Sequence, residues 1–585
     1  MTDSALSPPD PAEVGLRWCL ALLDGLVAGG VRHLVLSPGS RSTPLILAAQ
    51  RRAAIALTAI LDERSAAFHA LGLARASGRP VALLATSGSA PAHWYPAVIE
   101  ASESEIPLVL ISADRPPELR GWGANQTIDQ TRLFGVQVRA FFDPGPPHDG
   151  PHADKTLSAL GLRAAATSRG PRPGPVHINL PLREPLVPGS AGKGRGPRAE
   201  GRGREWTLDL GPWPLLPAGA APPEGLLARL GERLQGRGLI LCGPDAYPAG
   251  LAPALSRAAR ALGVPVLADP LSGLRFGPDS GARIARYDSL LRNPEAAAAL
   301  RPDWVLRLGR APVSRTLIDW LTGVPSLLVD PTGRWSDPSH DLMLSLACDP
   351  SALCARIAAE PWTCAGPAWL AAWQTAERRA AALARELLDS APWCEPHLIE
   401  DLIGAVPAGE GLFCANSLPI RQLDTWSGCR EAPLAVFGNR GASGIDGQMS
   451  TLTGLNAGGV PTVGLLGDLS FLHDLSGSLL AGRLDRPCIV LNNGGGRIFD
   501  YLPQHGLPDF ERLWRTPPRL DLGALARAFG LAHCRVEEPG GWRQALAAGL
   551  AGHPGTLIEV RVDAERSRAL HLEYWHRLRT PGALD

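Results

Sequence analysis

The chain of 585 residues is long enough to form about three domains, each with a core of its own. Its 45% hydrophobic and 19% charged residues are typical of soluble globular proteins. The 57 basic residues balance the 57 acidic residues, so net charge does not favour binding to nucleic acid or to an anionic membrane. Any anion-binding site must therefore be local.

The cysteines and the N-terminus indicate the compartment. The ten cysteines are scattered from Cys19 to Cys534 without a C-x-x-C pair, which argues against zinc, iron–sulfur clusters and a disulfide framework. Residues 1–14 lack the basic and apolar regions of a signal peptide, and no apolar run approaches the ~18 residues of a membrane helix. We expect a cytoplasmic protein without a transmembrane segment.

From residue 14 to 186, short apolar runs alternate with helical patterns. The runs predicted as strands are 33–37, 54–63, 81–88, 107–114 and 175–181. Because they lack polar alternation, they indicate a parallel sheet covered by helices on both faces. Residues 187–204 are rich in glycine, positively charged and without periodicity, which favours a solvated linker over an anion-binding arm.

The same alternation continues along the rest of the chain. A second set of predicted strands lies at 238–243, 264–269, 304–309 and 325–330. After an Ala-rich helical segment at 366–390, a third set lies at 411–417, 434–441, 461–468, 487–495 and 555–563. We predict three successive doubly wound α/β domains with parallel sheets, at 1–186, 205–365 and 366–585, with 187–204 as the linker.

Common nucleotide-binding motifs are absent from the sequence. Neither of its two lysines, Lys155 and Lys193, lies in a G-x-x-x-x-G-K-[ST] motif, and no predicted strand leads into a G-x-G-x-x-G motif. ATP and NAD are therefore disfavoured as ligands.

The segment 463–503 indicates a metal site. Asp468 ends one predicted strand, the next sixteen or so residues are predicted to form a crossover helix, and Asn493 ends the following strand. A right-handed crossover brings both ends to the carboxyl edge of the sheet, where α/β proteins bind ligands. Asp468, Asn493 and the carbonyl of Gly495 would supply hard oxygen ligands, which select Mg²⁺. A helix beginning near Phe471 would offer N–H groups to phosphates.

Gly-Asp followed about 25 residues later by Asn-Asn, each at a strand end, resembles the signature of the thiamine-diphosphate-dependent enzymes. Either dipeptide alone is common in turns. The resemblance implies pyrimidine-binding, central and diphosphate-binding domains, with thiamine diphosphate and Mg²⁺ or Mn²⁺ as cofactors. It also implies cofactor contacts from the residues around both dipeptides: Gly467, Asp468, Leu469, Ser470, Asn493, Gly495 and Ile498.

In these enzymes a glutamate of the first domain activates the cofactor, and Glu63 at the end of the predicted strand 54–63 matches it. An apolar pocket raises the pKa of a carboxyl group, which would let Glu63 share a proton with N1′ of the aminopyrimidine ring. Its neighbours Ala66, Ala67 and Phe68 would supply that surrounding. The alternative, a first-turn acid favoured by the helix dipole, is compatible with the same sequence.

Further strings resemble the branch of this family that acts in menaquinone and phylloquinone biosynthesis. They are SPGSRSTPL (37–45), TSGSAPAHWYPAVIEA (86–101), ADRPPELRGWGANQTIDQ (113–130), NSLPIRQLD (416–424) and NRGASGIDGQMST (439–451), with a weaker match at RAPVSRTL (310–317). The resemblance implies a transferase that decarboxylates 2-oxoglutarate and adds the four-carbon remainder to the conjugated double bond of isochorismate.

The matched motifs also imply substrate contacts. Polyanionic substrates suit arginine, whose planar fork binds carboxylates bidentately. On the isochorismate side and around the reacting groups the resemblance implies Ser40, Arg41, Arg115, Asn125 and Gln126, with Arg41 and Gln126 as catalytic partners of Glu63. Toward the 2-oxoglutarate-derived carboxylate it implies Ser417, Arg421 and Arg440, with Arg315 from the central domain as a further cation. Ile445 would wedge the cofactor into a bent shape beside Ser417, and Ile498, Phe499 and Leu502 would form an apolar wall.

Two positions depart from the pattern, since some members carry Lys-Arg where Ser314-Arg315 stands and a third Asn where Gly494 stands.

The resemblance further implies a homodimer or homotetramer whose active sites lie at the subunit interface. Alternatives are another 2-oxoacid decarboxylase or carboligase of the same family, such as an acetohydroxyacid synthase, and a non-catalytic binding protein with the same fold.

Overall fold

The computed structural model describes residues 10–189, 222, 225–279, 281–362, 366–552 and 554–580. The predicted linker at 187–204 lies outside these residues from position 190 on. Within the described ranges, no helix has the length and apolar character needed to cross a membrane. Contacts divide the chain into two compact units, and the first contains Met1–Leu216 with Gly441–Ser443 and Thr453–Gly459.

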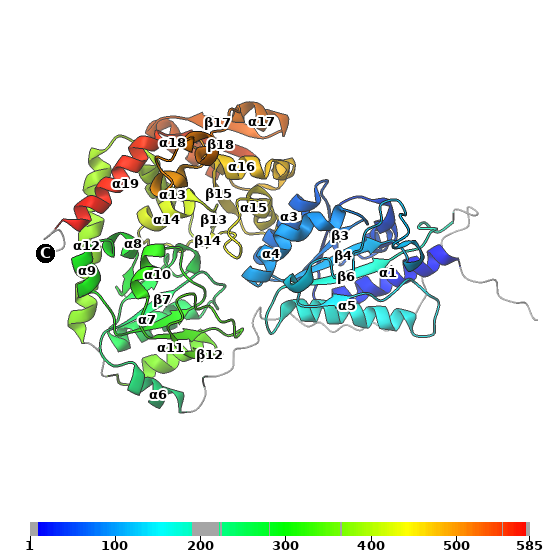
Figure 1. The fold of residues 1–585 in the computed structure, drawn as a ribbon, viewed down its shortest axis with the longest axis horizontal. Coiled ribbons are helices and arrows are strands. Elements are labelled where there is room, and N and C mark those ends of the chain that lie inside the picture. Colours follow the sequence, from blue (N-terminus) through cyan, green and yellow to red (C-terminus); the bar gives the residue numbers. More distant parts are fainter. Residues whose placement is uncertain are drawn as a thin grey trace, which may run out of the picture. The chain divides into compact units, whose positions relative to one another are not determined.

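The first unit contains a six-stranded parallel sheet in the order β2-β1-β3-β4-β6-β5 (Figure 1). Its strands are β1 (His33–Leu36), β2 (Ala56–Ala59), β3 (Val81–Ala85), β4 (Leu108–Asp114), β5 (Phe141–Phe142) and β6 (Pro175–Pro181). Its helices are α1 (Pro11–Ala28), α2 (Thr43–Gln50), α3 (Glu63–Ser77), α4 (Tyr95–Ser104) and α5 (Ala153–Arg169), with 3-10 turns η1 (Ser40–Ser42), η2 (Ala90–Trp94), η3 (Pro117–Leu119) and η4 (Gly135–Gln137).

The second unit contains two further six-stranded parallel sheets, and the central one has the order β12-β11-β10-β7-β8-β9. Its strands are β7 (Gly238–Cys242), β8 (Val266–Ala268), β9 (Arg283–Ile284), β10 (Trp304–Leu308), β11 (Ser326–Val329) and β12 (Leu342–Leu346). The accompanying helices are α6 (Leu226–Arg233), α7 (Leu251–Leu262), α8 (Tyr287–Leu290), α9 (Pro294–Ala299), α10 (Arg315–Leu321) and α11 (Pro350–Ala359), with the 3-10 turn η5 (Pro270–Ser272).

The third sheet has the order β14-β13-β15-β16-β18-β17. Its strands are β13 (Gly411–Cys414), β14 (Ala435–Phe437), β15 (Thr462–Gly467), β16 (Cys488–Asn492), β17 (Ala532–Val536) and β18 (Thr556–Arg561). Its helices are α12 (Pro367–Ser390), α13 (Glu395–Ala405), α14 (Leu418–Trp426), α15 (Gln448–Ala457), α16 (Asp468–His473), α17 (Leu522–Ala528), α18 (Pro539–Leu550) and α19 (Ala564–Arg579). The short elements are η6 (Leu475–Arg483), η7 (Arg497–Tyr501) and the π-helical turn η8 (Glu511–Arg515). α12 and α19 pack side by side (Figure 1).

The first and third sheets share one topology. In each, the first strand lies between the second and third, so the connections leave it in opposite directions. Such a switch point opens a crevice at the carboxyl ends of the two central strands, which is where α/β sheets bind ligands. The crevices lie between β1 and β3 in the first sheet and between β13 and β15 in the third.

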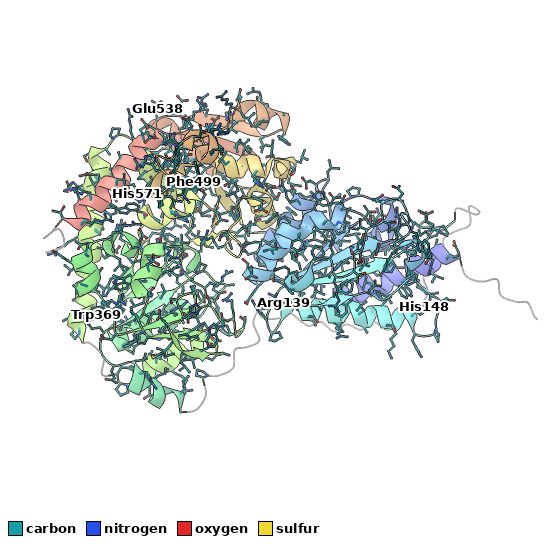
Figure 2. All side chains as sticks on the ribbon, in the orientation of Figure 1. Arg139, His148, Trp369, Phe499, Glu538 and His571 are labelled. Atoms are coloured by element: carbon teal, nitrogen blue, oxygen red, sulfur yellow. The ribbon has the colours of Figure 1, made fainter. Side chains whose placement is uncertain are left out.

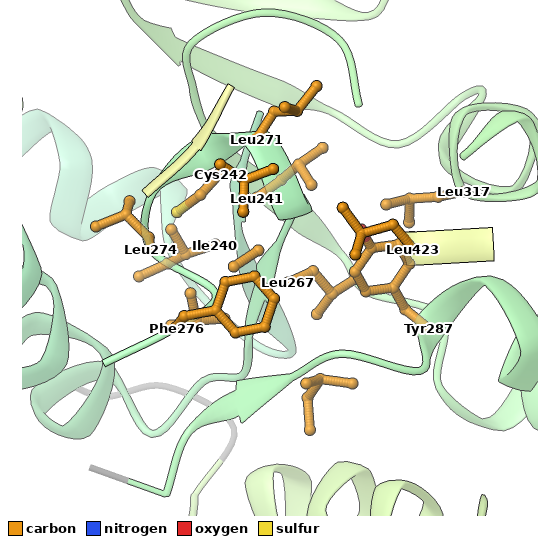
Figure 3. Close-up of a cluster of buried hydrophobic side chains, with 14 of the residues drawn as sticks. Ile240, Leu241, Cys242, Leu267, Leu271, Leu274, Phe276, Tyr287, Leu317 and Leu423 are labelled. Carbon is orange, nitrogen blue, oxygen red and sulfur yellow. The ribbon is translucent and has the colours of Figure 1, made fainter. Parts of the chain in front are cut away.

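A continuous apolar core joins the central and third sheets (Figure 3). Leu267 and Leu271 of the central part and Leu423 of α14 belong to one buried cluster. The guanidinium of Arg275, fully buried, donates to Asp424 Oδ1 at 2.6 Å, to the Asp424 carbonyl at 2.9 Å and to the Tyr287 hydroxyl at 2.7 Å. This shared core explains why the two sheets form one compact unit.

The predicted fold class is confirmed, and the differences concern edges and connections. The strand predicted at 54–63 ends at Ala59, so Glu63 begins α3 and does not end a strand. The crossover predicted after Asp468 as one helix is α16 followed by η6, and it begins at Asp468, ahead of the predicted start near Phe471. Four strands have no counterpart among the predicted ones, and all lie at sheet edges: β5, β9, β12 and β17. Edge strands are short or half exposed, so they lack a continuous apolar run.

Candidate active site

In the first unit, the ends of β1 and β3 meet at the switch point. Gly39 follows β1, and a Cβ atom at this position would lie 2.3 Å from the Thr86 side chain that follows β3. The glycine therefore permits a close approach of the two loops. It is followed by Ser40, which is exposed, and Arg41, which is buried, both in η1.

The Arg41 side chain is 4% exposed. Its Nη1 donates to the Leu182 carbonyl at 2.9 Å, and its Nη2 donates to the mostly exposed Glu184 carboxylate at 3.0 Å. Burial lowers the pKa of Arg41, and the nearby charge of Arg115 lowers it further. A guanidinium keeps its charge under such a shift, so Arg41 is a fixed cation at this edge of the sheet.

A loop carrying Gln126 covers the end of β3. Gln126 has a positive φ of 55°, its Nε2 donates to the Ser87 carbonyl at 3.0 Å, and the Ser87 hydroxyl donates to the Gln126 carbonyl at 3.1 Å. Gly88, at φ 88°, leaves the room that this contact needs, since a Cβ there would lie 2.9 Å from Gln126 Cγ. The backbone position of Gln126 is thus determined by the β3 loop. Arg115, following β4, donates to the Asn125 carbonyl at 3.4 Å, so the two matched motifs at 113–130 are in contact.

A buried polar network beneath this loop was missed by the sequence analysis. Gln130 accepts from the Gly88 N–H at 3.1 Å and donates to Asn179 Oδ1 at 3.0 Å. The Ser112 hydroxyl bonds to Asn179 and to the His177 ring, whose pKa burial lowers to about 3. The signal in the sequence was the presence of polar residues inside the otherwise apolar runs of β4 and β6.

Glu63 is the first residue of α3, but it does not cap the helix. The cap is Asp62, whose carboxylate accepts from the Arg64 N–H at 2.8 Å and the Ser65 N–H at 3.3 Å. The Glu63 side chain is partly exposed, while Ala66, Ala67 and Phe68 behind it are buried. Because Asp62 accepts from these two N–H groups, α3 does not need the Glu63 carboxylate as its cap.

In the second unit, Asp468 links the ends of β15 and β16. Its Oδ2 accepts from the Gly495 N–H at 2.8 Å and the Gly494 N–H at 3.1 Å, and its Oδ1 accepts from the Leu469 N–H at 2.7 Å. The side chain is buried, which raises its pKa, while these three N–H groups act in the opposite direction. The predicted juxtaposition of Asp468 with the Asn-Asn-Gly segment is present. Gly467, Leu469 and Ser470 flank Asp468 in the chain.

The two asparagines at the end of β16 bind different buried glutamates. Asn492 Nδ2 donates to Glu559 at 2.6 Å, and Asn493 Nδ2 donates to Glu395 at 2.7 Å. Burial raises the pKa of Glu395, and the donors Asn493 and Gln422 act against that shift. The sequence analysis did not select Glu395 or Glu559, because neither belongs to the dipeptide motif.

Asn416 organises the loop 439–444 near the end of β13. Its Nδ2 donates to the carbonyls of Asn439 and Gly444 at 2.6 and 2.7 Å, and its Oδ1 accepts from Arg440 at 2.8 Å. The next residue, Ser417, has φ 73°, and its carbonyl accepts from Arg421 at 2.5 Å. Burial lowers the pKa of Arg421, and the charge of Arg440 lowers it further. The sequence-predicted cations Arg421 and Arg440 are therefore close enough to interact, and Ile445 follows this loop half-buried.

The remaining predicted site residues lie in or directly after η7 and at the start of α10. Phe499 lies half-buried in η7 (Figure 2), as does Ile498. Leu502, directly after η7, is 39% exposed. Arg315 begins α10, and its side chain, 81% exposed, pairs with Asp319. Ser314 caps this helix by accepting from the Leu317 N–H, and it donates to Asp288. Ser314 thus has a structural function at the position where some family members carry lysine.

The described residues contain no group of three or more His, Cys, Asp or Glu side chains arranged to hold a metal.

Two family models match the chain. "Thiamine pyrophosphate enzyme, N-terminal TPP binding domain" matches residues 20–133, and "Middle domain of thiamine pyrophosphate" matches residues 227–414. Among solved structures, a proposed thiamin diphosphate-dependent enzyme from Mycobacterium smegmatis has a TM-score of 0.68 at 19% identity, covering 93% of this chain and 99% of that one. Fold and sequence together define a thiamine-diphosphate-dependent enzyme.

Curated relatives specify the family. The 2-succinyl-5-enolpyruvyl-6-hydroxy-3-cyclohexene-1-carboxylate synthase of Dechloromonas aromatica is 42% identical over 94% of this chain and 99% of its own. The synthase of the same name from Chloroflexus aurantiacus is 41% identical over 96% of this chain and 95% of its own. The chain belongs to the 2-succinyl-5-enolpyruvyl-6-hydroxy-3-cyclohexene-1-carboxylate synthase family.

The glycine loop after β16 yields a stability prediction. Gly495 has φ 108°, and a Cβ there would lie 2.2 Å from the Arg515 carbonyl oxygen. We expect Gly495→Ala to lower the free energy of unfolding by about 1–3 kcal/mol for the strained backbone and by about 1–3 kcal/mol more for the clash, measured by urea denaturation. Gly552→Ala is the control, because its φ is 101° and its Cβ meets nothing within 4 Å. Equal losses in the two variants would contradict the tight packing of the loop.

Proposed function

We propose that this protein decarboxylates 2-oxoglutarate with thiamine diphosphate and Mg²⁺ and adds the remaining four-carbon unit to isochorismate. The product is 2-succinyl-5-enolpyruvyl-6-hydroxy-3-cyclohexene-1-carboxylate, an intermediate of menaquinone or phylloquinone biosynthesis, and the activity is that of a transferase. The observation that carries the proposal is the similarity to synthases of this name over nearly the whole chain.

The residues at the ends of β15 and β16 fit Mg²⁺ and a diphosphate. Asp468 is a buried carboxylate at a strand end, and Asn493 and the Gly495 carbonyl add neutral oxygens. Hard oxygen donors of this kind, few enough to leave places for phosphate oxygens and water, suit Mg²⁺, and Mn²⁺ accepts the same donors. We assign these three as metal ligands, with Gly467, Leu469, Ser470, Ser417, Ile445 and Ile498 around the cofactor.

When bound, thiamine diphosphate would supply a carbon nucleophile for the 2-oxo group and an electron sink for the decarboxylation. The protein must hold a proton at N1′ of its aminopyrimidine ring, and Glu63 is assigned to that position. Two observations support the assignment: Asp62 already caps α3, and the residues that follow on the helix, Ala66, Ala67 and Phe68, are apolar and buried.

The arginines and amides at the two switch points are assigned to the substrates. At the switch point of the first sheet, Arg41 is a fixed cation and Gln126 a constrained amide. These two are assigned to isochorismate and the reacting groups, together with Ser40, Arg115 and Asn125. Arg421 and Arg440 are neighbouring cations at the other, suited to the 2-oxoglutarate-derived carboxylate. Phe499 and Leu502 are assigned to an apolar wall, and Arg315 stays a prediction from its motif alone.

The proposed catalytic unit is a homodimer or homotetramer in the cytoplasm. The support for this assembly is the family relationship. In the proposed dimer, Glu63 of one copy is assigned to the cofactor that Asp468 of a second copy holds.

A first prediction concerns the substrates. With isochorismate as acceptor, we expect 2-oxoglutarate to cause a loss of isochorismate absorbance together with CO₂ release. Pyruvate should cause neither, because it lacks the second carboxylate that Arg421 and Arg440 are assigned to bind. Efficient turnover of pyruvate would instead support a different 2-oxoacid carboligase.

A second prediction isolates Glu63. Glu63→Gln keeps the size of the side chain but cannot exchange a proton, so we expect cofactor binding near that of the unchanged protein by calorimetry. The rate of hydrogen–deuterium exchange at C2 of the bound cofactor should fall by about 10²–10⁴-fold. The control is Glu118→Gln, an exposed acid of the same unit paired with Arg183. Unchanged exchange in Glu63→Gln would remove Glu63 from the mechanism.

A third prediction tests the shared site. Glu63→Gln and Asp468→Asn should each be inactive alone, and their mixture should regain activity, because a hybrid dimer contains one site with both residues intact. Subunit exchange is followed with differently tagged chains. A mixture that exchanges subunits and stays inactive would show that Glu63 and Asp468 act within one chain.

A further inference from the structure

A buried carboxylate outside every motif holds the side chain of Asn493. Glu395 is the first residue of α13 and is 1% exposed. Its Oε1 accepts from Asn493 Nδ2 at 2.7 Å, and its Oε2 accepts from Gln422 Nε2 at 2.8 Å. Both oxygens therefore bind amide groups of residues that are distant in the sequence.

This contact determines which way the Asn493 amide faces. An asparagine side chain has one carbonyl oxygen and one NH₂ group, and a half-turn about its last bond exchanges them. An ionised carboxylate only accepts hydrogen bonds, so the NH₂ group must face Glu395 and Oδ1 must face away from it. Only Oδ1 can ligate a cation, which makes the orientation decisive for a metal site.

The backbone of Asn493 is held separately. Arg497 Nε donates to the Asn493 carbonyl at 2.9 Å, and Arg497 Nη1 pairs with Asp500 and Glu565. The loop position therefore does not depend on Glu395, whereas the direction of the side-chain amide does.

We propose that Glu395 is a positioning residue that orients Asn493 Oδ1 toward Mg²⁺. The proposal rests on the proposed magnesium and thiamine diphosphate site. Residues that orient metal ligands typically contribute about 10–100-fold in metal affinity, and Glu395 belongs to this class although it touches neither metal nor substrate.

The neighbouring asparagine provides a matched control. Asn492 donates in the same way to Glu559, which is 3% exposed, but it is not assigned to the metal. Replacing either glutamate removes a buried carboxylate from an adjacent asparagine in the same unit. Both replacements should lower the stability of the protein, whereas only the replacement of Glu395 should lower its metal affinity.

The first experiment measures the Mg²⁺ concentration needed for thiamine diphosphate binding, by calorimetry on the full chain. We expect Glu395→Met to raise this concentration by about 10–100-fold and Glu559→Met to leave it within about threefold of the unchanged protein. Equal shifts in the two variants would overturn the proposal. No Mg²⁺-dependent binding by the unchanged protein would overturn the proposed function itself, and the positioning role with it.

The second experiment remains informative if Glu395→Met does not fold. Asn493→Asp alone would place two carboxylates against each other. We therefore expect this variant to need more Mg²⁺ than the unchanged protein for thiamine diphosphate binding, although an aspartate is by itself a stronger Mg²⁺ ligand than an asparagine. In the double variant Asn493→Asp with Glu395→Gln, the amide NH₂ group at position 395 donates to the carboxylate at position 493. The pair also keeps the single negative charge of the unchanged protein. The double variant should need at least tenfold less Mg²⁺ than Asn493→Asp. A double variant no better than the single one would contradict orientation by residue 395.

Discussion

The carboxylate of Asp468 joins the ends of two neighbouring parallel strands, and the conformation of the loop after β16 depends on it. Its Oδ2 binds the N–H groups of Gly494 and Gly495, which pulls the loop after β16 onto the end of β15. Parallel pairing of the two strands already places these ends at one edge of the sheet. The carboxylate then determines the loop conformation that only glycine, at these positive φ values, adopts without strain.

The first and third sheets repeat one strand order, and each places polar residues at its own switch point. In the first sheet a buried guanidinium and a constrained amide gather there, and in the third an acidic residue and a pair of arginines. The two units thus present different chemistry at equivalent positions of the same topology.

The interior strands and the dipeptide signature could be predicted from the sequence because their information is local. Continuous apolar runs identified the central strands, and Asp468 and Asn493 stood at the ends of two of them. The edge strand β12 is half exposed and gave no such signal. Glu395 and Gln130 were missed for another reason: each acts through residues brought near it by the fold, and Glu395 lies 98 positions from Asn493. Glu63 was assigned from the family resemblance, while the structure added that Asp62 caps α3.

The buried contact between Arg275 and Asp424 holds α14 against the central part of the second unit. Asp424 lies three residues after Arg421 on α14, so the helix that carries this cation is tied to the central sheet through a fully desolvated pair. Removing one partner of such a pair typically costs about 3–5 kcal/mol of folding stability. The binding free energy of a weakly bound ligand is too small to compensate for this loss. Under the proposed assignment of Arg421 to the donor carboxylate, a donor of another length is therefore accommodated more readily by a change of the side chain at position 421 than by displacement of its helix.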